Sequence, residues 1–143
     1  MLSVPAPAKL SLHWARLAAN ASQLDATRRN VVEFRQKSWW NEDVFRAFRK
    51  AGIIFCSCSG PALPDELVGT TDEVYVRLHG PKRWCGRDYS PEELAKWAKR
   101  IRATGAKRAR GYFNNDYDAH ATTNAKALHD LLVPSRKRRR DPV

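Results

Sequence analysis

The sequence predicts an α/β fold in which short parallel strands alternate with helices in one domain. Apolar or alternating segments typical of strands occur at residues 31–35, 53–58, 74–79 and 108–114. Amphipathic segments with helical spacing follow most of these strands. Such alternation is typical of parallel sheets with right-handed crossovers. The 143 residues are enough for one domain with a hydrophobic core.

The N-terminal 30 residues are expected to form an irregular start and a helix. Residues 1–8 are rich in proline and alanine, and apolar side chains then recur at a spacing that predicts a helix over residues 9–21. Residues 134–143 are expected to be a basic, disordered tail. The folded domain is therefore predicted to span residues 31–133.

The first strand of this domain, residues 31–35, leads into a predicted helix. Asn41 is a favourable N-cap, and Gly52 is a natural C-terminal stop. The predicted buried stripe of this helix consists of Val44, Phe45, Phe48 and Ala51. The second strand, residues 53–58, is almost entirely apolar, which suits a strand that is covered on both faces.

A third strand, residues 74–79, precedes the strongest helix signal of the chain. Ser90–Glu93 combines an N-cap, a proline at the first helical position and a glutamate three residues after the cap. We expect this helix to end at Gly105. A fourth strand over residues 108–114 and a helix over residues 121–132 complete the order. The apolar residues predicted to pack inward from the last helix are Leu128, Leu131 and Leu132.

Polar side chains lie at the ends of three predicted strands. The carboxyl ends of parallel strands meet at one edge, which is where open α/β sheets and (β/α) barrels bind their ligands. The residues concerned are Glu33, Arg35, Arg77, His79, Asn114 and Asn115. We interpret this edge as a candidate ligand site. Separate ion pairs at the strand ends, or a merely solvated edge, are the alternatives.

The residue types suggest a division of roles at this edge. Arginine captures planar phosphate or carboxylate groups, so Arg35 and Arg77 are predicted to bind an anionic ligand. Histidine titrates near neutral pH, so Glu33 and His79 are the candidate catalytic acid and base. The two asparagines supply uncharged hydrogen bonds that orient the ligand.

Aromatic and thiol side chains near this edge have two interpretations each. Trp39 either walls the pocket or packs over the barrel end or the first turn of a helix. Cys56 and Cys58 share one face of a strand, which is compatible with a soft metal, but zinc usually requires four ligands. Only the fold can bring Cys85 and His79 close enough to complete such a set. We therefore expect buried cysteines that act as small apolar residues, and we predict neither a metal site nor a cofactor.

The charge balance favours anionic partners. The chain has 26 Lys and Arg against 15 Asp and Glu, a net charge of +11. Part of this charge lies in the tail, at Arg136, Lys137, Arg138, Arg139 and Arg140, which is suited to salt-dependent binding of nucleic acid. No apolar run approaches the roughly 20 residues of a membrane span. The lack of a signal peptide and of a disulfide pattern favours a cytoplasmic protein without a membrane partner.

Four ordered motifs resemble a known family. They are Val-Val-Glu-Phe-Arg-x-x-Ser-Trp-Trp at residues 31–40, Val-Tyr-Val-Arg-Leu-His-Gly-Pro at 74–81, Tyr-Ser-x-Glu-Glu-Leu-x-x-Trp at 89–97 and Tyr-Phe-Asn-Asn-Asp at 112–116. In this order they resemble the domain of unknown function 72, or YecE-like, family over about residues 30–132. The resemblance implies a TIM-type (β/α) barrel, in a family whose biochemical activity is not established.

The resemblance further implies that this chain is the C-terminal half of a TIM-type barrel. A TIM barrel has eight strands and about 250 residues, whereas the four parallel strands here, with helices packed outside, resemble strands five to eight. Residues 1–30 then correspond to a remnant of the preceding βα unit. Two motifs depart from the family pattern. Gln36-Lys37 stands where His-Pro is usual, and Cys56-Ser57-Cys58 stands where a strand more typically ends in an acid.

Three functions follow as hypotheses. The first is binding of, or action on, a small anionic ligand, phosphorylated or sugar-like, at the strand ends. The second is a truncated, non-catalytic domain that associates with itself or with the missing half, because a half-barrel leaves two strand edges open. The third is nucleic-acid binding through the basic tail, although no nucleic-acid-binding motif accompanies it.

Overall fold

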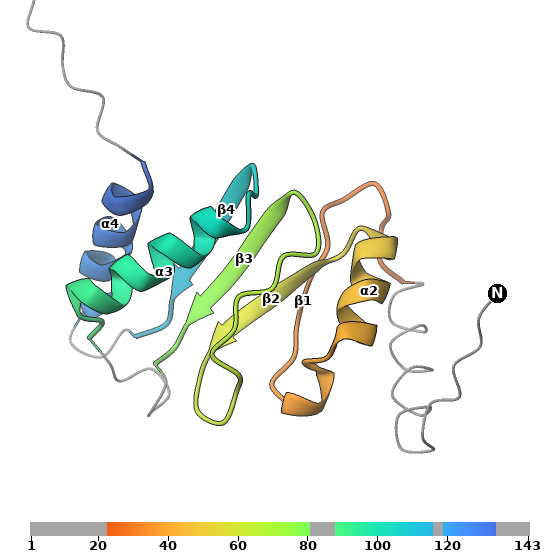
Figure 1. The fold of residues 1–143 in the computed structure, drawn as a ribbon, viewed down its shortest axis with the longest axis horizontal. Helices are drawn as coiled ribbons and strands as arrows, with labels where there is room; N and C mark the ends of the chain where they lie inside the picture. The colour runs from red at the N-terminus through yellow and green to blue at the C-terminus, as the bar shows by residue number, and fades with distance from the viewer. Residues whose placement is uncertain (1–22, 81–87, 116–118, 134–143) are drawn as a thin grey trace, which may run out of the picture. The chain divides into compact units, whose positions relative to one another are not determined.

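The computed structural model describes residues 23–80, 88–115 and 119–133 (Figure 1). The chain divides into two compact units, Met1–Asn30 and Val31–Val143. The elements of the second unit are β1 (Val31–Glu33), η1 (Lys37–Trp39), α2 (Glu42–Ala51), β2 (Ile54–Ser59), β3 (Glu73–Leu78), α3 (Pro91–Ala103), β4 (Arg108–Phe113) and α4 (His120–Leu132). The predicted helix over residues 9–21 and the basic tail lie outside the described residues. None of the helices so described is long and apolar enough to cross a membrane.

The strands of this unit form one parallel sheet in the order β1-β2-β3-β4. The register pairs Glu33 with Cys56, Cys58 with Arg77, and Arg77 with Tyr112. The predicted α/β class with parallel strands is therefore confirmed. The first strand is shorter than predicted, because pairing with β2 ends at Glu33.

Helix α2 begins and ends where the sequence predicts. Oδ1 of Asn41 accepts a hydrogen bond from the backbone N–H of Val44 at 3.1 Å, which satisfies a donor that lacks a partner within the helix. Gly52 follows the helix with φ of +66°, a left-handed conformation that glycine adopts without strain from a Cβ atom. The buried residues of the helix are Val44, Phe45 and Phe48, whereas Ala51 at its end is exposed.

Helix α3 carries the predicted capping box. Oγ of Ser90 accepts from the backbone N–H of Glu93 at 3.3 Å, and Oε2 of Glu93 accepts from the backbone N–H of Ser90 at 2.9 Å. The helix buries its predicted face, which consists of Leu94, Trp97, Ala98 and Ile101. Thr104 caps the helix, and Gly105 follows with φ of +65°.

Helix α4 packs against α3 and β4 and differs from its prediction at one position. Leu128 is buried and Leu132 partly so, but Leu131 is 39% exposed. The prediction of an inward Leu131 was wrong because the helix is rotated so that the row of Asn124, Leu128 and Leu132 faces the core. Leu131 lies about 100° away from Leu132 around the helix axis.

The helices cover one face of the sheet. Val74, Val76 and Leu78 of β3 belong to a core cluster with residues of α3 and α4. Phe55 of β2 lies among aromatic rings at 4.9–5.9 Å, contributed by Phe34, Trp40, Phe45 and Phe48. Phe55 and Ser57 point to one side, and Ser57 pairs with Val76, so both clusters lie on the same face. The alternate residues of each strand occupy the opposite face.

The described part of the first unit is a turn organised by Asp25. Its Oδ1 accepts from the backbone N–H of Thr27 at 2.9 Å and from the Thr27 hydroxyl at 2.6 Å. Its Oδ2 accepts from Nε of Arg28 at 3.1 Å. These bonds hold the pKa of Asp25 below its usual value.

Candidate functional site

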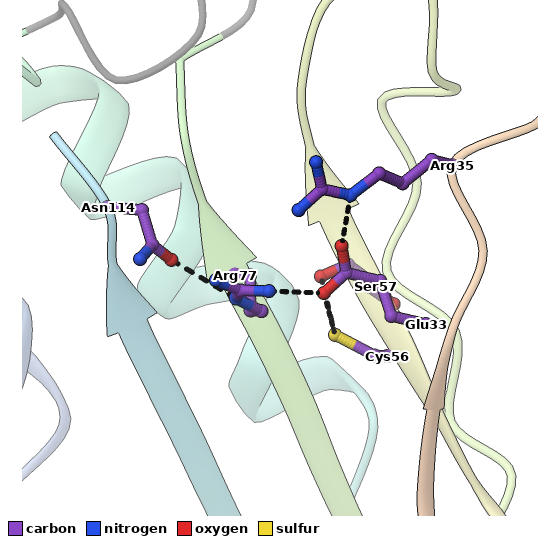
Figure 2. A network of polar contacts seen from close by, with 6 residues as sticks. All are labelled: Glu33, Arg35, Cys56, Ser57, Arg77 and Asn114. Atoms are coloured by element: carbon purple, nitrogen blue, oxygen red, sulfur yellow. Dashed lines mark hydrogen bonds and ion pairs between the residues drawn. The ribbon is translucent and has the colours of Figure 1, made fainter.

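The carboxyl ends of β1, β3 and β4 meet at one edge of the sheet. Glu33 is the last residue of β1, Arg77 precedes the last residue of β3, and Asn114 follows β4 directly. The side chains of Glu33, Arg35, Arg77 and Asn114 form one connected group, which we call the strand-end network (Figure 2). The structure thus brings four of the predicted site residues together.

Glu33 is the centre of the strand-end network. Its Oε1 accepts from Nε of Arg35 at 3.0 Å, and its Oε2 accepts from Nη1 of Arg77 at 2.7 Å. Arg77 also donates from Nε to Oδ1 of Asn114 at 3.1 Å. Arg77 therefore links the two outer strands of the sheet, and the network of one acid and two arginines carries a net positive charge.

The arginines keep Glu33 ionised. Burial raises the pKa of Glu33, but the hydrogen bonds and positive charges of Arg77 and Arg35 outweigh this effect and hold the pKa below its usual value. In return, the hydrogen bond to Glu33 raises the pKa of Arg77. Glu33 is therefore a carboxylate at neutral pH. It fits the role of proton acceptor or charge partner better than the role of acid.

Two cysteines of β2 lie beside this carboxylate, and both are buried free thiols, as predicted. Sγ of Cys56 donates to Oε2 of Glu33 at 3.9 Å. Burial raises the pKa of both thiols, and the negative charge of Glu33 raises it further. The pKa of Cys58 reaches about 12, so this thiol is protonated at neutral pH.

His79 completes the buried side of the edge. It is 3% exposed, and its backbone N–H donates to the carbonyl of Ser59 at 3.0 Å. Burial lowers the pKa of His79, and the charge of Arg77 lowers it further against the opposing charge of Glu33. Ligand atoms of Glu33, Cys58 and His79 all lie within 4.8 Å of one another. Three strand ends thus bring a carboxylate, a thiol and an imidazole together.

Two predicted site residues lie elsewhere. Trp39 stacks on Phe34 with 4.5 Å between ring centroids and 8° between ring planes, in agreement with its packing interpretation. Asn115 is fully buried, and its Nδ2 donates to Oδ1 of Asn124 on α4 at 2.7 Å. Successive residues of an extended segment point to opposite sides, so Asn114 reaches Arg77 while Asn115 reaches the helix.

Sequence reasoning missed the role of Asn124. This buried side chain accepts from Asn115 and from the backbone N–H of Tyr89, and its Nδ2 donates to Oδ1 of Asp88 at 2.9 Å. It therefore joins the end of β4 to the start of α3. The available signal was a polar residue four positions before Leu128 on an otherwise apolar face of the helix.

The sheet face that carries the strand-end network also carries polar and aromatic side chains further from the strand ends. Tyr75 and Tyr112 stack with 4.8 Å between ring centroids. Below them, Oε1 of the buried Glu73 accepts from Nε of Arg110. The period-two alternation of β3 and β4 places these side chains on the same face as Arg77, a signal that is present in the sequence.

Two cavities lie away from this face. One of about 540 Å³ lies between the loop after β2 and helix α3, beside Asp65, Leu67 and Arg100. A smaller one of about 160 Å³ lies beside Tyr89 and Trp97. No member of the strand-end network lines either of these two cavities.

Comparison with known proteins establishes the family. A protein-family model described as "Protein of unknown function DUF72" matches residues 1–142. The chain belongs to the DUF72 family. This membership confirms the resemblance that the four ordered motifs indicated. No curated protein matches this DUF72 chain.

Solved DUF72 structures share the fold of this chain. A crystal structure of a DUF72 family protein from Thermotoga maritima has a TM-score of 0.70 at 27% identity, and the match covers 80% of this chain and 48% of that chain. Two crystal structures of a DUF72 family protein from Enterococcus faecalis have TM-scores of 0.69 and 0.68 at 16% and 18% identity. They cover 89% and 91% of this chain, and 54% and 57% of their own chains.

This DUF72 chain therefore spans about half the length of these solved relatives. Its four parallel strands and the helices on one face are consistent with part of the barrel-like fold of those proteins.

Proposed function

We propose that this DUF72 chain binds a small anionic ligand, phosphorylated or sugar-like, at the carboxyl ends of its strands. The observation that carries the proposal is the convergence of Arg35, Arg77 and Asn114 around the ionised Glu33. Guanidinium groups bind phosphate and carboxylate through paired, charge-assisted hydrogen bonds. One carboxylate among two arginines leaves positive charge for a ligand.

Two donors of the strand-end network have capacity for a ligand. Within the described residues, Nε and Nη1 of Arg77 are engaged, whereas its Nη2 and the Nδ2 of Asn114 make no hydrogen bond. Arg35 has a side chain that is 59% exposed, so a ligand reaches its guanidinium without rearrangement of the core. These groups come from different strand ends and frame one patch.

Proton transfer to or from such a ligand would fall to Glu33 and His79. The lowered pKa values of both groups favour the proton-accepting forms at neutral pH. In this proposal they act as bases, and the arginines hold the anion. A cytoplasmic location and nucleic-acid binding through the basic tail stay predictions from the sequence.

Calorimetric titration with inorganic phosphate and with a sugar phosphate tests the proposal. We expect saturable binding that weakens about 10- to 100-fold in Arg35→Gln, the loss expected for one charge-assisted hydrogen-bond pair. Arg100→Gln is the matched control, because Arg100 pairs with Asp65 on the helix-covered side of the sheet. A chain without residues 134–143 controls for binding by the tail. Equal losses in Arg35→Gln and Arg100→Gln would contradict the proposal.

A second candidate function is self-association. Within the part of the chain that the structure describes, the outer strands β1 and β4 form the edges of the sheet, and Val31 and Tyr112 on them are 39% and 45% exposed. Unpaired strand edges are templates for further pairing, and two copies related by a twofold axis would supply the eight strands of a closed barrel. Size-exclusion chromatography with light scattering should then report a dimer. A monomer at all accessible concentrations would contradict this candidate.

A further inference from the structure

We propose that Glu33, Cys58 and His79 form a binding site for one zinc-class transition-metal ion. These residues stand at the ends of β1, β2 and β3, and one ligand atom of each lies within 4.8 Å of the other two. The inference concerns the same edge of the sheet as the proposed anion site, but it requires no anionic ligand. An experiment can therefore contradict metal binding without contradicting anion binding, and the reverse also holds.

The separations suit a tetrahedral ion. Zinc bonds of about 2.0–2.3 Å place tetrahedral ligand atoms roughly 3.3–3.7 Å apart. The three ligand atoms lie no more than 4.8 Å from one another, so each pair needs to close by about 1.1–1.5 Å at most. Side-chain rotation supplies such a movement while the paired strands keep their register.

The ligand types select the ion. One thiolate sulfur, one imidazole nitrogen and one carboxylate oxygen form a mixed set that suits Zn²⁺ or Co²⁺. Mg²⁺ and Ca²⁺ prefer oxygen ligands throughout and are disfavoured by the sulfur of Cys58. Three protein ligands leave a fourth position for water or for the oxygen of a ligand, as in catalytic zinc sites.

The surroundings support coordination. Oε2 of Glu33 accepts from Arg77 and Cys56. Within the described residues Oε1 accepts only from Arg35, so with about two lone-pair positions per oxygen Oε1 keeps capacity for a metal bond. Hydrogen bonds of this kind orient metal-bound carboxylates. Cys58 and His79 are 1% and 3% exposed, whereas the Glu33 side chain is 18% exposed and marks the side of entry.

Coordination changes the charge at the site in a defined way. The sulfur of Cys58 binds the ion as a thiolate, so the thiol proton is released to solvent when the bond forms. The thiolate and the Glu33 carboxylate then offset the charge of a divalent ion, while Arg35 and Arg77 leave the site as a whole positive. His79 binds as a neutral imidazole and releases no proton.

Cys56 provides a matched control for Cys58. The two cysteines share a strand face and are equally buried, at 1% exposure each. The thiol of Cys56 contacts Oε2 of Glu33 at 3.9 Å but is not a member of the convergent group. The geometry therefore assigns metal binding to one of two cysteines that are otherwise alike.

Titration of the full chain with Co²⁺, and with Zn²⁺ against a chromophoric chelator, tests the inference. We expect one equivalent of Co²⁺ to bind with an intense thiolate-to-cobalt absorption band. Cys58→Ser should abolish the band and weaken Zn²⁺ binding about 100-fold or more. Cys56→Ser should retain both the band and the affinity. His79→Gln should weaken binding and change the absorption spectrum of the bound Co²⁺.

A measurement on the unsubstituted chain covers the case in which a buried substitution prevents folding. ¹¹³Cd bound to the wild-type chain should give one resonance in the range of mixed sulfur, nitrogen and oxygen coordination. Loss of the cobalt band in Cys56→Ser but not in Cys58→Ser would overturn the assignment. So would a cadmium resonance typical of oxygen and nitrogen ligands alone, or the absence of stoichiometric binding.

Discussion

Replacement of Glu33 by glutamine should lower the free energy of unfolding more than removal of an exposed surface charge usually does. The Glu33 side chain is 18% exposed, and its partner Arg77 is 30% exposed. A charge-assisted hydrogen bond in such a setting contributes about 1.5–3 kcal/mol. The second pair, to the largely exposed Arg35, contributes at most about 1 kcal/mol. Because glutamine retains one neutral hydrogen bond, we expect Glu33→Gln to cost about 2 kcal/mol at pH 7.

The effect should depend on pH in a specific direction. The pKa of Glu33 in the folded chain lies below its ordinary value of 4.5, so its ionised form stabilises the fold at higher pH. This stabilisation fades as the pH falls below about 4.5 and through the folded pKa. The difference in unfolding free energy between wild type and Glu33→Gln should therefore be largest near neutral pH and should shrink in acid.

Urea unfolding followed by circular dichroism, with EDTA present, measures this difference. Glu42→Gln is the control, because the Glu42 and Arg49 side chains are 61% and 46% exposed, and their pair should contribute no more than about 0.5 kcal/mol. Equal losses in Glu33→Gln and Glu42→Gln would refute the reasoning. A loss for Glu33→Gln that stays constant from neutral pH down to about pH 3 would refute it as well.

Substitutions at four further positions test the packing, the helix ends and a strand glycine by urea unfolding. Phe55→Ala should cost about 3–5 kcal/mol, because the ring is fully buried among other aromatic rings, and a loss below about 1 kcal/mol would contradict this. Asn41→Ala should cost about 1 kcal/mol by removing the cap of α2, whereas Asn41→Asp should retain stability. Gly111→Ala should be neutral or stabilising by up to about 1 kcal/mol, since a Cβ atom there meets neighbours no closer than 3.6 Å. Gly52→Ala should instead cost about 1 kcal/mol at φ of +66°, and the opposite order of the two glycine variants would contradict the backbone argument.

Local chemistry made the elements of this fold predictable. The cap at Asn41 and the capping box at Ser90 act within a few residues, and both form in the structure. Apolar and alternating segments likewise marked the strands within one or two residues of their ends. The error at Leu131 arose because inward packing depends on how a helix is rotated against its neighbours, which nearby residues do not specify.

The sequence could not predict which of two adjacent polar residues belongs to the candidate site. Asn114 and Asn115 were equivalent in the sequence, yet one joins Arg77 and the other joins Asn124. The strand alternates its side chains, but only the position of the neighbouring elements decides which of the two faces the candidate site.

The sequence by itself determined the α/β class, the parallel order of strands and helices, the helix caps and the family resemblance. These properties follow from short-range periodicity and from motifs that lie contiguously in the chain. The tertiary structure alone decided that Glu33 lies between Arg35 and Arg77 and that Cys58 and His79 lie close to it. That convergence depends on strand register and crossovers, which bring together residues 19 to 46 positions apart in the chain.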